Sequence, residues 1–100
     1  MTRLSLFVEL KAKPGKEEEV AAFLSGAQSL VGAEPGTIAW FAVRFDAHTF
    51  AVFDAFNDET GRQAHLTGRI AEALHARSDE LFVNSPMIRS ANVLADKLPA

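Results

Sequence analysis

The segment from Phe50 to His65 places the strongest limits on how this chain can fold. Residues 50–56 read Phe-Ala-Val-Phe-Asp-Ala-Phe, Asn-Asp-Glu-Thr follows, and a histidine comes about two helical turns later. An almost wholly apolar strand with one carboxylate, at Asp54, is therefore followed at once by a helix start. Side chains alternate between the two faces of a strand, so both faces need cover. A chain of 100 residues cannot easily provide all of that cover itself, which favours self-association.

Composition narrows the class of protein. The length predicts one domain over residues 1–100. The net charge of −3 gives no basic surface for nucleic acid. The absence of cysteine excludes disulfides, thiolate nucleophiles and Cys-ligated metals. No apolar run approaches the ~20 residues of a membrane span, and the first residues enter a strand pattern with no signal peptide. We therefore expect a cytoplasmic protein with no nucleic-acid or membrane partner.

The pattern along the chain predicts the element order β-α-β-β-α-β. Strands are expected at residues 4–11, 37–45, 49–56 and 88–94. Helical apolar spacing begins after Pro14 and ends at Gly32, and a second helix is capped by Asn57 or Asp58. Residues 46–48 are expected to form a hairpin loop, and residues 78–85 an irregular segment. This order predicts an α+β, ferredoxin-like protein with a four-stranded antiparallel sheet and both helices on one face.

The two faces of the predicted sheet differ in composition. One set of alternating side chains is wholly apolar and is expected beneath the helices: Leu4, Leu6, Val8, Leu10, Ala39, Phe41, Val43, Phe45, Ala51, Phe53, Ala55, Ala91 and Val93. The opposite set mixes aromatic and ionisable side chains and is expected away from the helices: Ser5, Phe7, Glu9, Ile38, Trp40, Ala42, Arg44, Phe50, Val52, Asp54, Phe56, Ser90, Asn92 and Leu94. This second face is too apolar for water. Two copies packed sheet to sheet are expected to enclose a cavity there.

Such a cavity suits a small molecule, because it combines apolar walls with a few polar groups. Six side chains of that face are candidates for substrate contact: Trp40, Phe7, Phe50, Phe56, Arg44 and Asn92. The alternative is ordinary packing of aromatic residues in a core or interface, with Arg44 paired to Asp54 or Glu9. Asn92 can equally satisfy backbone groups alone.

His65 is the first candidate for a proton-transfer group. It lies next to the predicted buried stripe of Leu66, Ile70 and Leu74, where its ring can face a cavity. A histidine can take a proton from a phenol or quinol, and the resulting anion can pass an electron to dioxygen without a metal or flavin. Asp54 is the candidate for orienting His65 or accepting a substrate hydroxyl. The alternatives are a histidine bonded to the sheet and a carboxylate paired with Arg44.

Several local motifs occur in a recognisable order. These are the Lys-Pro-Gly-Lys-Glu helix entry at residues 13–17, the Glu-Pro-Gly-Thr turn at residues 34–37, and residues 53–59 leading to His65 and Leu66. Together with the element order, they resemble the antibiotic biosynthesis monooxygenase (ABM) superfamily over nearly the whole chain. The resemblance implies a ferredoxin-like protomer in a homodimeric α/β barrel. It also implies activities such as cofactor-independent oxygenation of quinols and polycyclic aromatics, haem degradation or isomerisation.

The chain departs from that family at two places. Many members have Glu and Trp at the end of the third strand, where this chain has Asp54 and Phe56. Haem-degrading members are expected to have an Asn in the first strand, in the region of Phe7 here, and a Trp at the third strand's end. Haem degradation is therefore not expected.

The sequence leads to one principal function and one alternative. The first is a homodimeric, cofactor-independent monooxygenase that acts with dioxygen on a hydroxylated aromatic or quinol, using His65 and Asp54 and no metal. The alternative is a non-catalytic dimeric module that binds a small ligand, or an isomerase of a small oxygenated metabolite. Glu72 and His75 have metal-pair spacing but no partners, and no phosphate loop or nucleophile elbow is present.

Overall fold

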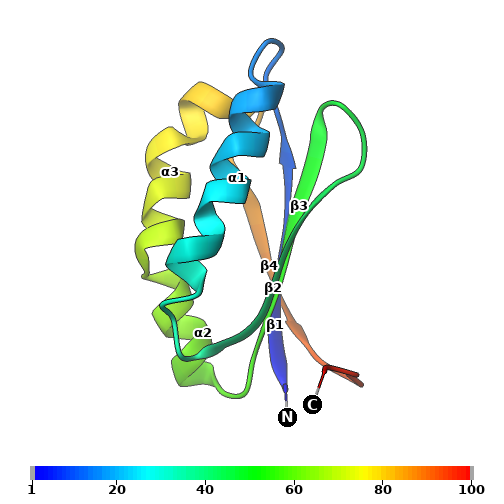
Figure 1. Ribbon diagram of the computed structural model, residues 1–100, viewed down its shortest axis with the longest axis vertical. Coiled ribbons are helices and arrows are strands. Elements are labelled where there is room, and N and C mark those ends of the chain that lie inside the picture. Colours follow the sequence, from blue (N-terminus) through cyan, green and yellow to red (C-terminus); the bar gives the residue numbers. More distant parts are fainter. Residues whose placement is uncertain (1, 100) are drawn as a thin grey trace.

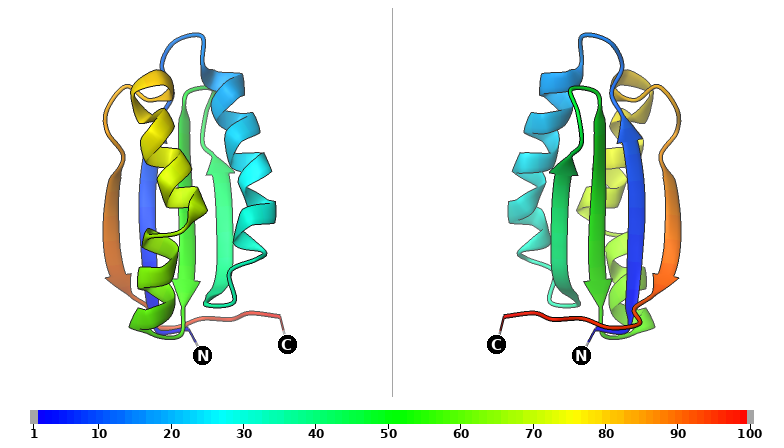
Figure 2. Two further views of the ribbon diagram at one scale, coloured as in Figure 1. Left: turned by 90° about the vertical axis from the view of Figure 1, so that its left-hand side faces the viewer. Right: turned by 90° about the vertical axis from the view of Figure 1, so that its right-hand side faces the viewer.

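The computed structural model describes residues 2–99, which form one sheet and three helices (Figure 1). In chain order the elements are β1 (Leu4–Lys11), α1 (Glu17–Val31), β2 (Thr37–Arg44), β3 (Thr49–Phe56), α2 (Glu59–Leu66), α3 (Arg69–Leu81) and β4 (Met87–Asn92). The strands pair antiparallel in the order β2-β3-β1-β4. All helices lie on one face of the sheet, and the other face carries none (Figure 2). The predicted α+β, ferredoxin-like fold is confirmed.

Short-range signals set several of the element ends. Helix α1 begins with three glutamates in its first turn. At its other end the Gly32 N–H donates to the Gln28 carbonyl and the Ala33 N–H donates to the Leu30 carbonyl. Helix α2 is capped by Asp58, whose side chain accepts a hydrogen bond from the Gly61 N–H at 2.9 Å. Within residues 2–99, no helix is long and apolar enough to span a membrane.

The second helical region differs from the prediction in two ways. It is divided into α2 and α3, separated by Thr67 and Gly68. It also extends through residues 78–81, which were expected to be irregular. The extension follows from packing, because Leu81 continues the apolar spacing of Ile70 and Leu74 and is fully buried.

The predicted faces of β2, β3 and β4 are wrong, whereas that of β1 is right. Directly opposite residues in an antiparallel sheet share a face, and Asp54 lies opposite both Leu6 and Trp40. Leu6 faces the helices, so Asp54 and Trp40 face them too. The register explains the error, since a shift of one residue moves a whole strand's side chains to the other face. Composition alone did not reveal that shift.

Burial of the phenylalanines confirms the corrected faces. Phe50 and Phe56, expected away from the helices, are 2% and 0% exposed beneath them. Phe41 and Phe53, expected in the core, are 55% and 41% exposed on the face without helices. The core therefore lies between the helices and a sheet face that carries one carboxylate on β3.

Candidate functional site

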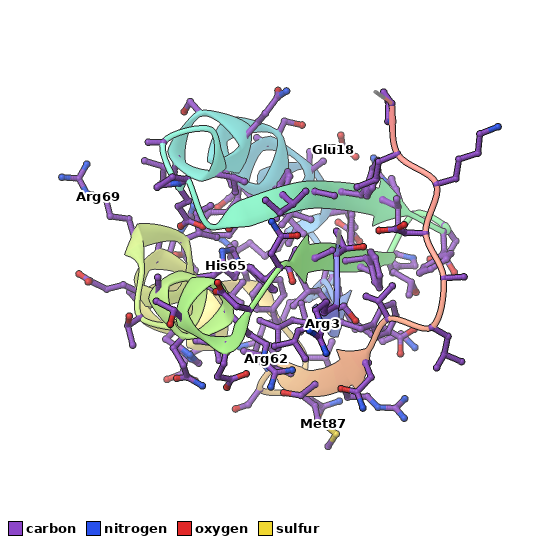
Figure 3. All side chains as sticks on the ribbon, turned by 90° about the horizontal axis from the view of Figure 1, so that it is seen from below. Arg3, Glu18, Arg62, His65, Arg69 and Met87 are labelled. Atoms are coloured by element: carbon purple, nitrogen blue, oxygen red, sulfur yellow. The ribbon has the colours of Figure 1, made fainter. Side chains whose placement is uncertain are left out.

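A buried histidine and two carboxylates from three parts of the chain form the centre of the site. His65 lies on α2 between that helix and the sheet (Figure 3). Its Nδ1 lies 2.6 Å from Oε1 of Glu34, in the turn between α1 and β2. Its Nε2 lies 2.9 Å from Oδ2 of Asp54, on β3. The predicted contact between Asp54 and His65 is therefore present, on the helix side of the sheet.

The two carboxylates favour the charged form of His65. Only a doubly protonated imidazole can donate from both ring nitrogens at once. Burial is the largest single influence and lowers the pKa of His65, but hydrogen bonds and charges from Asp54 and Glu34 together raise it above its ordinary value. The Phe56 ring, centred 5.4 Å from the imidazole, covers the group on one side.

Close backbone packing places α2 so that His65 reaches both carboxylates. A Cβ at Gly61 would lie 2.8 Å from the carbonyl oxygen of Gly36, so the first turn of α2 meets the α1–β2 turn directly. In that same turn, the Thr37 hydroxyl donates to Oε1 of Glu34 at 2.8 Å. Helix and turn are thus joined by backbone contact and by the Glu34–His65 bond.

Glu34 was missed by the sequence analysis, where it was assigned only to a turn. A positional signal did exist. Thr37 pairs with Phe56 in the register, so a residue just before Thr37 must lie near the chain that leaves β3 for α2. An acid in that turn can therefore reach a histidine on α2.

A small internal cavity of about 40 Å³ lies between the sheet and the helices. Apolar side chains from all four strands and all three helices line it, and Asp54 and His65 are its ionisable groups. Asp54 is only 2% exposed. Within the described chain, its Oδ1 and the Nε1 of Trp40 are buried without a hydrogen-bond partner. The cavity therefore borders a carboxylate with one oxygen still able to accept a hydrogen bond.

An open groove of about 490 Å³ runs between α1 and β2, and we call it the α1–β2 groove. Its walls come from Ala21, Leu24, Ser25 and Gln28 of α1, from residues 40–44 of β2, and from Phe50. Leu24 and Trp40 line both the groove and the internal cavity.

The structure places the predicted substrate contacts in several separate locations. Trp40 lies at the cavity, Phe56 packs on His65, and Phe50 and Arg44 line the α1–β2 groove. Phe7 lies on the sheet face without helices, in a separate depression of about 570 Å³. Asn92 is exposed at the end of edge strand β4. The expectation that all six line one cavity is therefore wrong.

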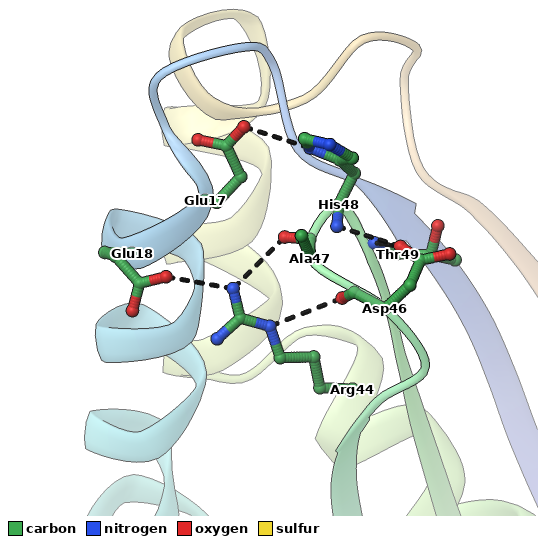
Figure 4. A network of polar contacts seen from close by, with 7 residues as sticks. All are labelled: Glu17, Glu18, Arg44, Asp46, Ala47, His48 and Thr49. Atoms are coloured by element: carbon green, nitrogen blue, oxygen red, sulfur yellow. Dashed lines mark hydrogen bonds and ion pairs between the residues drawn. The ribbon is translucent and has the colours of Figure 1, made fainter.

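Arg44 pairs with α1 and the hairpin loop instead of with Asp54 (Figure 4). Its guanidinium donates to Oε2 of Glu18 at 2.9 Å and to the carbonyls of Asp46 and Ala47 at 3.3 and 3.1 Å. Arg44 lies opposite Phe50, whereas Asp54 lies opposite Trp40, four residues away from Arg44 along β2. The alternative in which Arg44 neutralises Asp54 is thus contradicted.

The part of the chain that the structure describes contains no group of three or more His, Cys, Asp or Glu residues arranged to hold a metal ion. His75 and Glu72, which share metal-pair spacing, are both exposed on α3.

Comparison with solved structures identifies a close relative of this chain. A crystal structure of the NE2512 protein of unknown function from Nitrosomonas europaea shares 56% identity over 100% of this chain and 97% of that chain, with a TM-score of 0.97. The chain belongs to the NE2512 family. This similarity does not indicate an activity for the chain, because the function of NE2512 is itself unknown. No protein-family model and no curated protein matches the chain.

More distant solved structures share the fold of the NE2512 family. A protein from Nitrosomonas europaea named "putative antibiotic biosynthesis monooxygenase" has 14% identity and a TM-score of 0.81, covering 92% of this chain and 90% of that one. A protein of the same name from Caulobacter crescentus has 18% identity and a TM-score of 0.78, covering 94% and 92%. At these identities the comparison supports an ABM-like fold.

Proposed function

We propose that this protein is a cofactor-independent monooxygenase that acts on a quinol or a related hydroxylated aromatic. The observation that carries the proposal is the buried Asp54 carboxylate, whose Oδ2 is bonded to His65 and whose Oδ1 remains free beside the cavity. A buried carboxylate with a free oxygen can accept a proton from a hydroxyl that enters the cavity. The ABM-like fold agrees with this chemistry.

The geometry divides the roles of the two predicted catalytic residues. His65 already binds a carboxylate at each nitrogen, so Asp54 Oδ1 is the atom that takes the substrate proton. His65 is a positioning residue whose charge stabilises Asp54, and Glu34 holds His65. The quinol anion then supplies electrons to dioxygen. One oxygen atom enters the ring, the other leaves as water with the two hydroxyl hydrogens, and the quinol becomes a hydroxyquinone.

The proposal includes a homodimer formed by the sheet face without helices. Phe7 and Phe41 lie on either side of Phe53 on neighbouring strands of that face, and Phe41 and Phe53 are exposed. Packing a second copy there would bury this aromatic surface. The cavity lies on the opposite side of the sheet, so each protomer would carry its own site.

A ligand-binding module is the alternative that one observation favours. The internal cavity, at about 40 Å³, is far smaller than the ~300 Å³ from which ligand pockets usually begin. A site that stays this closed would not admit an aromatic ring to Asp54. Proton transfer by the same carboxylate would also serve an isomerase, which would consume no oxygen.

Oxygen uptake with a panel of quinols and polyphenols tests the proposal. We expect at least one quinol to be consumed faster with the protein than without it. Asp54→Asn should reduce the catalysed rate by about 10²–10⁴-fold, the usual contribution of a general base. Asp79→Asn is the matched control, because Asp79 is exposed on α3, and it should leave the rate unchanged. Uptake that no quinol increases, or that Asp54→Asn retains in full, would overturn the proposal.

A further inference from the structure

The α1–β2 groove and the internal cavity are neighbours that share two side chains. Leu24 of α1 and Trp40 of β2 line both spaces, so these side chains form the wall between them. The groove is open to solvent at the edge of the sheet, because β2 is an edge strand. The cavity behind the wall contains Asp54.

The two spaces have complementary properties for one ligand. The groove, at about 490 Å³, is large enough for a ring system but contains no free buried acid. The cavity is too small for a ring, but Asp54 Oδ1 borders it as a free acceptor. A flat molecule in the groove with a hydroxyl directed inward would use both.

Trp40 is held in this wall by packing and not by hydrogen bonding. Its Nε1 is buried and has no partner among the described residues. Rotation of the indole therefore breaks no hydrogen bond to the protein. An unpaired N–H is itself costly to bury, so a ligand oxygen that accepts from it would be favoured.

We propose that the α1–β2 groove and the internal cavity are two parts of one binding site for a flat hydroxylated aromatic. The ring occupies the groove, displacement of Leu24 and Trp40 joins the two spaces, and the ligand hydroxyl donates to Asp54 Oδ1. This inference rests on the site of the proposed function, but it concerns binding and the route of entry, which can be measured without turnover.

Trp40 is the only tryptophan, so the protein has a single indole N–H resonance that reports directly on this wall. We expect beta-naphthol to shift that resonance saturably in a proton–nitrogen correlation spectrum. Its methyl ether cannot donate to Asp54 and should bind at least about tenfold more weakly, the effect of losing one hydrogen bond to a charged group.

Two matched variants test the route. Ser25→Phe places a large side chain in the groove, whereas Ser29→Phe makes the same change at an exposed position one turn later on α1 that does not line it. We expect Ser25→Phe to weaken beta-naphthol binding at least tenfold and Ser29→Phe to leave it unchanged. Circular dichroism and the unligated spectrum verify that both variants are folded.

Equal binding by the two variants, an indole resonance that never moves, or equal affinity for beta-naphthol and its methyl ether would overturn the inference. The result also separates it from the proposed function. If Ser25→Phe weakens beta-naphthol binding and Ser29→Phe does not, but no quinol increases oxygen uptake, the groove is supported as a binding site and the monooxygenase proposal is excluded. If Ser25→Phe retains normal oxygen uptake, the monooxygenase proposal is supported and the groove is excluded as the route of entry.

Discussion

At the scale of the residue, the main feature is a charged histidine buried between two acids. Burying ions is costly, and breaking one contact leaves a charge without compensation. His65, Asp54 and Glu34 offset that cost for one another through contacts of 2.6 and 2.9 Å. Such groups also occur as purely structural ion pairs. The free oxygen of Asp54 beside a cavity is what favours chemistry here.

The raised pKa of His65 predicts how stability depends on pH. The folded protein holds this proton more tightly than the unfolded chain, whose histidine titrates near 6.5. Protonated His65 therefore stabilises the folded state in full below pH 6.5. This contribution to the free energy of unfolding is lost as pH rises through the higher pKa of His65 in the folded protein. Glu34→Gln removes one carboxylate that raises this pKa, so the stabilisation should be smaller and its loss should be complete at a lower pH.

Urea unfolding at a series of pH values on both sides of 6.5 measures this effect. Glu72→Gln, an exposed change on α3, is the matched control and should follow the unmodified protein. A free energy of unfolding that rises with pH across this window, or that responds equally to both variants, would contradict the assignment of charge to His65.

At the scale of the element, the contact between α2 and the α1–β2 turn positions the site. Gly61→Ala would place a Cβ 2.8 Å from the Gly36 carbonyl oxygen. Backbone has to move to relieve that clash, so we expect a loss of about 1–3 kcal/mol in stability and a change in the His65 resonances. Chemical denaturation and a proton–carbon spectrum of the histidines provide the two measurements.

Gly26→Ala is the control, because Gly26 lies inside α1 and a Cβ there meets nothing within 4 Å. It should leave stability unchanged or raise it by up to about 1 kcal/mol through better helix propensity. If the two glycine variants were equally stable, α2 would not be held by this contact.

The sequence predicted elements more accurately than it predicted faces. Strand alternation, the Asp58 cap and Gly32 are local signals, and the structure confirms them. The face of β3 depends on its register with β1, which loops and long-range packing decide. Placing the Asp54 carboxylate on the helix side of the sheet is energetically unfavourable when strand β3 is considered by itself. Its partner Glu34, distant in sequence, is what makes the burial of Asp54 and His65 tolerable.

At the scale of the whole molecule, the sheet separates two surfaces with different uses. The helix side, where all three helices lie (Figure 2), contains the cavity. On the opposite side Phe41 and Phe53 are exposed. The alternation of side chains in the sequence predicts dimer contact and ligand binding on one and the same face, away from the helices. Their separation means that association of two copies and ligand binding can be altered independently.

Phe53→Glu is expected to convert the proposed dimer to a monomer by placing a charge among exposed phenylalanines, while the binding of beta-naphthol persists. Sedimentation velocity measures the change. Val83→Glu, at an exposed position between α3 and β4, is the control and should remain dimeric. If the unmodified protein is a monomer, or if the Phe53→Glu variant remains dimeric, the sheet face without helices is not the dimer interface.

The most direct test of the proposed monooxygenase reaction uses dioxygen labelled with a heavy oxygen isotope and a quinol that the protein consumes. Monooxygenation predicts that the hydroxyquinone carries one labelled atom, that the second appears in water, and that Asp54→Asn abolishes the labelled product. A quinone without label, accompanied by hydrogen peroxide, would show simple oxidation of the quinol and would contradict the proposed reaction.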